Sequence, residues 1–357
     1  MSGIEQRVAQ LAAEVRPVDR QAEAAALERH EQLTKPSGSL GGLEALGARL
    51  AGVAGRCPPP VPAAPVVVVA AGDHGVLAQG VSPWPQEVTA AMVAGIAAGR
   101  AAVNVLAGVV GAQVTVLDVG VAATLPPHPR VRRAKVRPGT ADLSEQPAMT
   151  REQAARAVLA GAGAAQELVE AGADLLVTGD MGIANTTPAA CLVAAFSGRP
   201  AAAVTGRGTG IDDATLAVKV KVVEQALARH APEPADPLGV LAAVGGLEHA
   251  ALTGVLLAGA AARVPVLLDG VNANAAALAA RAFTPQAVGY LVAGHRSVEP
   301  GATAALAALG LDPLVDLGMR LGEGTGALLA VPIVRSAAAL LSGMATFAEA
   351  GVGGSAR

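Results

Sequence analysis

The sequence predicts an α/β protein with a Rossmann-like, mostly parallel sheet and helices on both faces of that sheet. Short apolar segments recur along the chain, and Ala-rich stretches of helical length separate many of them. These segments are continuously apolar, as expected of strands that are covered on both faces. Strands that alternate with helices are typical of βαβ units. The segments expected to be strands are 65–71, 113–119, 174–178, 201–205, 264–268 and 289–293.

The first 56 residues precede this pattern and are predicted to be helical. Apolar residues from Ile4 to Val15 recur at helical spacing, a second helix is expected over 20–31, and leucines from Leu43 onward mark a third. Residues 33–42 have the composition of a loop. The proline-rich run 57–62 is expected to be a stiff linker before the first strand. At the other end of the chain, the pattern predicts an Ala/Leu-rich helix near 326–348.

Composition excludes several classes of function. Lys and Arg number 26 against 29 Asp and Glu, and aromatic residues make up 1% of the 357 residues, so a nucleic-acid binder is not expected. Cys57 and Cys191 lack a CxxC partner, which argues against a disulfide framework or a zinc cage. Mean hydropathy is +0.47, but Gly, Pro and charged residues interrupt the apolar runs before about 18 residues. The N-terminus has no signal-peptide pattern. We therefore expect a cytoplasmic protein with no membrane partner.

Polar residues gather next to glycines just after the predicted strands, and this placement is the main functional signal. The first group, 71–76, contains Asp73 and His74. They can form a catalytic or binding pair, or a turn in which Asp73 accepts backbone hydrogen bonds. No nucleophile-elbow serine accompanies them, so a hydrolase triad is not expected.

The second group, 178–187, lies between a predicted strand and a helix and contains Asp180, Gly182 and Asn185. A Gly-rich turn before a helix N-terminus presents free N–H groups that suit a phosphate. The alternative is helix capping by Asn185 or Thr186. Asp180 has no obvious capping duty, so the pattern favours phosphate or ribose binding.

The third group, 205–213, has glycines at alternate positions, including Gly206 and Gly208. Such glycines allow the backbone to approach an anion closely. The group is not a dinucleotide fingerprint, which requires GxGxxG and an acid about 20 residues later. Lys219 follows in the next helix and can reach a phosphate. Taken alone, it fits an ordinary solvated lysine better.

Two further groups lie in the last quarter of the chain. In 293–301, Ser297 and neighbouring amides can bind phosphate oxygens or simply begin a helix. In 319–327, Glu323 stands between two glycines before a long apolar helix. It can be a favourable charge at a helix N-terminus. The stronger interpretation is a general base, because the glycines let a flat ring approach and an apolar pocket raises the pKa of a carboxyl group.

Seven segments together resemble the nicotinate-nucleotide–dimethylbenzimidazole phosphoribosyltransferase family, and the resemblance spans about 33–347. They are LTKPSGSLGGLE, AGDHGV, PAMT, GDMGIANTTPAA, LLDG, GHRSVEPG and MRLGEGTGA. The resemblance implies transfer of phosphoribose from nicotinate mononucleotide to 5,6-dimethylbenzimidazole, which yields α-ribazole 5′-phosphate and nicotinate in cobalamin lower-ligand synthesis. It also implies a homodimer. Each chain would have a large α/β domain, 61–330, and a small helical domain built from 1–60 and 331–357.

The resemblance assigns roles to individual residues. The general base of the family falls on Glu323, and its second acidic residue falls on Asp180, where the family usually has Glu. The phosphate-binding lysine falls on Lys219, and Asp269 and Ser297 match positions near the ribose phosphate. Ala184 stands where the family usually has Gly. Three further positions also depart from the usual family sequence: Ser37, Gly42 and Ala302.

The chemistry implied by this resemblance needs no cofactor or metal, because nicotinate leaves the sugar as a neutral ring nitrogen. Glu323 would take the proton of the attacking base and Asp180 would support positive charge on the ribose. Two alternatives remain at this point, a Rossmann-type oxidoreductase and a nucleotide-binding homologue without catalysis. The preferred base stays open.

Overall fold

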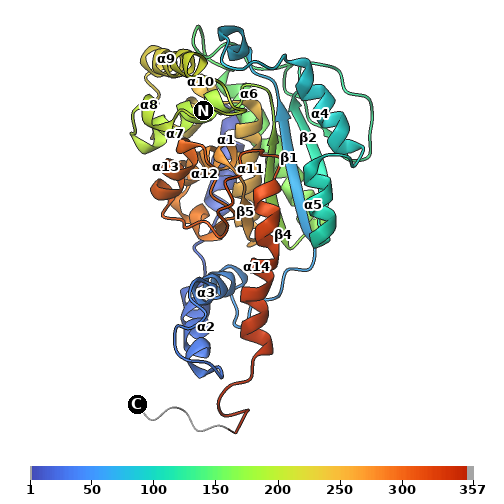
Figure 1. The fold of residues 1–357 in the computed structure, drawn as a ribbon, viewed down its shortest axis with the longest axis vertical. Helices are drawn as coiled ribbons and strands as arrows, with labels where there is room; N and C mark the ends of the chain where they lie inside the picture. The colour runs from blue at the N-terminus through green and yellow to red at the C-terminus, as the bar shows by residue number, and fades with distance from the viewer. Residues whose placement is uncertain (1, 352–357) are drawn as a thin grey trace.

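Six parallel strands form one sheet in the computed structural model, which describes residues 2–351 of the chain (Figure 1). Their order across the sheet is β3-β2-β1-β4-β5-β6, and every neighbouring pair is parallel. The order reverses between β1 and β4, and doubly wound sheets bind ligands beyond the carboxyl ends of the strands at such a point. The strands are β1 Pro65–Gly72, β2 Gln113–Gly120, β3 Val131–Arg133, β4 Leu175–Met181, β5 Val266–Leu268 and β6 Leu291–Ala293.

The predicted fold class and five of the six predicted strands are confirmed, but 201–205 is not a strand. It forms the short helix α8, Ala201–Val204, because three alanines favour a helix and only one residue of that helix is β-branched. The prediction also missed β3. That strand has three residues, two of them arginines, and lies at the edge of the sheet, where no apolar run is needed.

The alternation of side chains along β1 divides the core into two layers. Val66, Val68 and Ala70 face one cluster of buried residues, and the residues between them face the other. The first layer is covered by α6 Arg151–Glu170, α11 Leu247–Ala261 and α12 Val271–Phe283. The second is covered by α4 Glu87–Ala97, α5 Ala102–Val110 and α14 Thr325–Gly343. Both faces of β1 are therefore buried, which explains its continuous run of apolar residues.

Helices α6 and α11 approach each other unusually closely. A Cβ on Gly161 would overlap the carbonyl oxygen of Ala251, and a Cβ on Gly254 would overlap that of Val158. The two helix backbones therefore touch through reciprocal glycines. This contact fixes the position of α11, whose first turn carries Glu248 and His249.

The N-terminal helices divide between two parts of the molecule. Helix α1, Gly3–Glu14, packs against α6 and α11, and its buried Val8 and Leu11 belong to the core of the sheet. Helices α2 Arg20–Gln32 and α3 Gly42–Ala54 pack against each other and against α14 in a lobe below the sheet (Figure 1). Their own small core includes Ala26, Ala51 and Leu341.

The remaining helices are η1 Gly75–Gln79, α7 Thr186–Ser197, α9 Asp213–His230, α10 Pro237–Val244, η2 Pro285–Tyr290 and α13 Pro300–Leu309.

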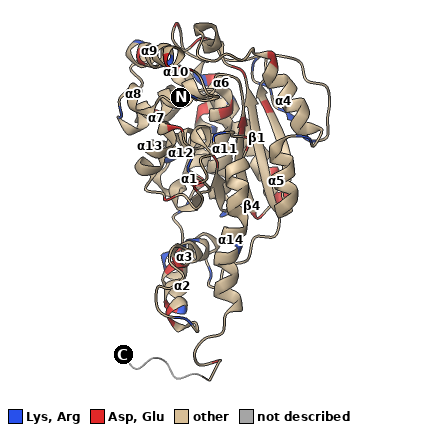
Figure 2. Cartoon of the chain, in the orientation of Figure 1, with Lys and Arg blue, Asp and Glu red and all other residues tan. Residues whose placement is uncertain are grey.

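Within residues 2–351, two segments are long and apolar enough to cross a membrane, contrary to the expectation that none reaches that length. They are Glu87–Val110 and Thr325–Gly343. The first contains two separate helices, α4 and α5, of 11 and 9 residues. The second is α14, which carries Arg335, and this side chain donates to the carbonyl oxygens of Pro62 and Val110. Buried core helices can have the same length and apolar composition as membrane-spanning helices. Figure 2 shows that α14 and α5 carry few charges.

Candidate active site

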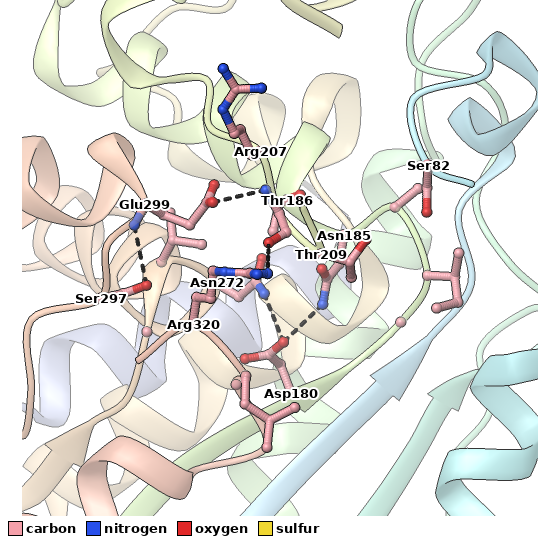
Figure 3. Close-up of a pocket in the computed structure, with 18 of the residues that line it drawn as sticks. Ser82, Asp180, Asn185, Thr186, Arg207, Thr209, Asn272, Ser297, Glu299 and Arg320 are labelled. Atoms are coloured by element: carbon pink, nitrogen blue, oxygen red, sulfur yellow. Dashed lines mark hydrogen bonds between the residues drawn. The ribbon is translucent and has the colours of Figure 1, made fainter. Parts of the chain in front are cut away.

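The loops that follow the carboxyl ends of β4, β5 and β6 enclose a cavity of about 100 Å³ (Figure 3). Most of its lining comes from four of the Gly-rich groups singled out in the sequence, 178–187, 205–213, 293–301 and 319–327. The rest comes from 81–82, Lys219 in α9 and the segment 270–272 after β5. The cavity lies at the edge of the sheet where ligands bind in this class of fold. The residues predicted for the site that line it are Asp180, Gly182, Asn185, Gly208, Lys219 and Ser297.

Asp180, near the end of β4, is the central carboxylate of the cavity. Its side chain is buried, and the amides of Asn185 and Asn272 both donate to Oδ2, at 2.8 and 2.7 Å (Figure 3). Oδ1 has no hydrogen-bond partner within residues 2–351. Burial, together with the charge of Asp269, raises the pKa of Asp180 to about 7. This residue can therefore be ionised at neutral pH, and its Oδ1 is a buried acceptor that no described residue uses.

The structure rejects helix capping as the duty of Asn185. This residue precedes α7 but makes no side-chain capping bond, and its amide is used on Asp180. Ala184 just before it has a φ of 71°, in the left-handed region that favours glycine. Gly182 has no room for a side chain, because a Cβ would overlap the carbonyl oxygen of Gly72.

Lys219 is buried, so the interpretation as a solvated lysine is wrong. Its ammonium group donates to the hydroxyl of Thr186 at 2.7 Å and to the carbonyl of Gly206 at 3.0 Å. Burial lowers the pKa of Lys219 to about 8. A lysine ammonium has three N–H donors, so one remains for an anion in the cavity.

Glycines make room for the residues around Lys219. A Cβ on Gly206 would overlap the carboxylate of Glu299, and Gly208 has a φ of 53° and donates its N–H to that carboxylate at 2.8 Å. Gly208 lines the cavity, whereas Gly206 lies behind it and contributes its carbonyl to Lys219. Ser297 is 3% exposed and also lines the cavity. Together these groups form a small polar pocket at one end of the cavity.

Glu323 lies next to the cavity rather than on its wall. The lining stops at Gly322, and the backbone carbonyl of Glu323 packs so tightly on Gly179 that no side chain would fit there. Its side chain is buried, forms no salt bridge, and has one oxygen without a hydrogen-bond partner in the described part of the chain. Burial raises its pKa, against a hydrogen bond from the backbone of Val103 at the start of α5. A buried carboxylate of this kind is suited to accept a proton.

Asp269 holds the loop that carries Glu323. Its two oxygens accept hydrogen bonds from the backbone N–H groups of Gly324, Gly326 and Ala327, at 2.9–3.0 Å. The side chain is fully buried and does not line the cavity. Its contacts are those of a cap for α14, and they fix the unusual backbone of Glu323, whose φ is 62°.

Asp73 and His74 lie behind the site rather than in it. Asp73 accepts a hydrogen bond from the backbone of Ala122 at 2.7 Å, which agrees with the expected turn in which Asp73 accepts backbone hydrogen bonds. His74 lies with its Nε2 3.0 Å from a carboxylate oxygen of Glu248. Neither residue lines the cavity, and both are buried.

Several lining residues were not predicted as site residues. Arg320 donates to the carbonyl of Gly208 at 2.9 Å and so joins two of the loops around the cavity. Other lining residues that the prediction missed are Ser82, Thr186, Arg207, Asn272, His295 and Glu299. Most of them lie within the Gly-rich groups already recognised or within three residues of Asp269. The signal for them was therefore position beside a glycine turn, rather than residue type.

The chain is similar to known phosphoribosyltransferases over most of its length. A family model described as phosphoribosyltransferase matches residues 15–352. Nicotinate-nucleotide–dimethylbenzimidazole phosphoribosyltransferase of Salinispora tropica is 60% identical over 354 residues, which covers 95% of this chain and 97% of that protein. The protein of that name from Chloroflexus aggregans is 56% identical over 336 residues, covering 94% and 95%.

A solved structure supports the same assignment. The crystal structure of nicotinate-nucleotide–dimethylbenzimidazole phosphoribosyltransferase from Thermus thermophilus has a TM-score of 0.90 and 50% sequence identity. It covers 94% of this chain and 99% of that one. This chain therefore belongs to the nicotinate-nucleotide–dimethylbenzimidazole phosphoribosyltransferase family and is a phosphoribosyl-transferring enzyme.

Proposed function

We propose that this enzyme moves the 5-phosphoribosyl group of nicotinate mononucleotide to a ring nitrogen of 5,6-dimethylbenzimidazole or a related base. The products are α-ribazole 5′-phosphate and nicotinate, as in cobalamin lower-ligand assembly. One observation carries the proposal. A buried lysine with a spare N–H and a carboxylate with a pKa near 7 line the same small cavity.

The phosphate of the nucleotide fits the polar pocket around Lys219. Lys219 supplies the positive charge, and Ser297 and Gly208 also line the cavity. Binding energy from this remote group holds the sugar in place for the reaction.

The transfer breaks one C–N bond and forms another at the anomeric carbon. The electron pair of the bond to the pyridinium ring stays on its nitrogen, so nicotinate leaves with a neutral ring nitrogen. A benzimidazole nitrogen attacks from the opposite face, and the proton on its other nitrogen passes to Glu323. Asp180 stabilises the positive charge that develops on the ribose through its free oxygen.

The volume of the cavity bears on where the sugar phosphate and the base bind. Its volume of about 100 Å³ is below the ~300–1,000 Å³ of ordinary ligand pockets, so we expect part of the substrates to lie outside it. The base would occupy the region of 81–92, where Val81 and Ser82 line the cavity mouth. We propose that the enzyme is a homodimer. Within each chain, we propose that α2, α3 and the end of α14 form the core of the small domain. Both cysteines are free thiols, which fits a cytoplasmic setting.

Incubation of the purified protein with nicotinate mononucleotide and a panel of bases tests the proposal. We expect nicotinate release that depends on the base, and a product with the mass of the base plus ribose phosphate. Lys219→Met should raise the KM for the nucleotide, whereas Lys221→Met, an exposed change on the same helix, should not. Nucleotide binding without nicotinate release for every base would contradict the proposal, and so would hydride transfer with a nicotinamide cofactor.

A further inference from the structure

A buried chain of polar side chains runs from the loop after β1 to Asp180 at the cavity. Its members come from four elements that lie far apart in the sequence. They are His74, Glu248, His249, Asn272 and Asp180, and none is more than 5% exposed. Among the described residues, no group of His, Cys, Asp and Glu has the geometry of a metal site, so this cluster requires another explanation.

The chain is linked by two ion-pair contacts at Glu248 and by two hydrogen bonds between His249 and Asp180. Nε2 of His74 lies 3.0 Å from Oε1 of Glu248, and Nδ1 of His249 lies 2.8 Å from the same oxygen. Nε2 of His249 lies 3.1 Å from Oδ1 of Asn272. Nδ2 of Asn272 then donates to Oδ2 of Asp180 at 2.7 Å. Only Asp180 and Asn272 line the cavity.

The direction of these bonds sets the charge of His249. Asn272 must turn its NH₂ group toward the carboxylate of Asp180, so its carbonyl oxygen faces His249. Both ring nitrogens of His249 therefore face acceptors, and both are donors only in the imidazolium form. Burial lowers the pKa of His249, but the contacts with Glu248, the charge of Asp180 and the carbonyl oxygen of Asn272 together raise it above its usual value. The pKa of Glu248 is lowered by His74 and His249 despite its burial.

We propose that His249, held as a cation by Glu248, is a positioning residue for Asp180: it orients Asn272 so that one oxygen of Asp180 is occupied and the other faces the ribose, and its charge keeps Asp180 ionised. The inference rests on the proposed function, in which Asp180 acts as a carboxylate. It assigns to two residues outside the cavity a specific effect on the reaction.

The titratable groups near His249 and Asp180 come from several neighbouring elements. On α11, Glu248 adjoins His249, and His74 and Asp73 follow β1. Asp269 follows β5 and raises the pKa of Asp180, whereas His249 lowers it. His249 is thus the cationic neighbour that favours the ionised form of Asp180. Its loss should move the pKa of Asp180 upward and leave less of the carboxylate form at acid pH.

The kinetic test is His249→Gln, since glutamine can still donate to Asn272 but carries no charge. If Asp180 acts as a carboxylate, kcat should fall about tenfold at about pH 6 and approach the wild-type value at about pH 9. A loss of the same size at every pH would indicate a merely structural role and would overturn the proposal. His30→Gln is the matched control, because His30 is also buried but lies between α2 and α3, away from this chain. It should not change the shape of the pH profile.

Nitrogen NMR of the histidine rings tests the same inference without turnover and also serves if the variant folds poorly. The wild-type protein has six histidines, and the signals absent from His249→Gln identify His249. If that variant folds poorly, the signals that shift in Glu248→Gln and persist in His74→Gln identify it instead. We expect an imidazolium at neutral pH in the unliganded protein, and neutral His249 when Glu248→Gln removes the carboxylate. A neutral His249 in the wild-type protein would overturn the proposal. Failure of the proposed function would appear separately, as absence of nicotinate release by the wild-type enzyme.

Discussion

Substitution of Glu323 tests the proposed chemistry most directly. We expect Glu323→Gln to lower kcat by about 10²–10⁴-fold, because the amide cannot accept the proton of the base. The KM for nicotinate mononucleotide should change little, since Glu323 is not among the residues around Lys219 that would hold the phosphate. Steady-state kinetics with both substrates measure the two effects. Glu170→Gln, an exposed change on α6, should leave both constants unchanged, and near-normal turnover of Glu323→Gln would remove it as the base.

At the same scale, six of the residues predicted from the sequence line the cavity, but sequence reasoning could not describe the environment of each side chain. Lys219 shows the limit, because its sequence neighbours fit a solvated lysine and only the packed helices bury it. Asp269 shows the opposite case. The family resemblance placed it near the ribose phosphate, whereas its carboxylate accepts hydrogen bonds from the backbone of the loop that carries Glu323. Burial and hydrogen-bond partners arise from contacts between distant segments, which residue type does not encode.

At the scale of elements, the contact between α6 and α11 should be highly sensitive to side-chain volume. Gly161→Val would drive its side chain into the Ala251 backbone, so we expect a loss of about 3 kcal/mol in the free energy of unfolding. Gly163→Ala, two residues along the same helix, meets no atom within 4 Å and should gain about 0.5–1 kcal/mol. Chemical denaturation compares the two. Equal effects of the two changes would mean that the helices are not in close contact.

The elements themselves were predicted well where a long apolar or helical pattern decides the structure. Strand β1 is such a case, with a run of valines buried on both faces. Short elements were predicted poorly, since α8 has four residues and β3 has three. Over so few residues, propensity is a weak guide: the alanines of α8 do favour a helix, but four residues are too few to establish a helical pattern in the sequence.

At the scale of the whole molecule, the pattern predicted a parallel sheet but not the order of its strands. That order brings Asp180 and Asn272, 92 residues apart, into one hydrogen bond. Such a pairing depends on the crossovers between strands, which local sequence does not specify. The predicted function is confirmed by the comparisons, because long motifs such as MRLGEGTGA identify a family even where geometry cannot be inferred.

The buried carboxylate of Asp180 should make the stability of the whole protein depend on pH. Its pKa is about 7 in the fold and near 3.8 in an unfolded chain, so between these values the folded state binds the extra proton. Stability from this group is therefore present at low pH and is lost as pH rises toward 7, by roughly 4 kcal/mol at most. Asp180→Asn removes that loss, so the Tm of the variant relative to the wild type should be higher at about pH 8 than at about pH 5. Thermal unfolding across this range measures the difference, and a pH-independent difference would mean that Asp180 keeps an ordinary carboxyl pKa.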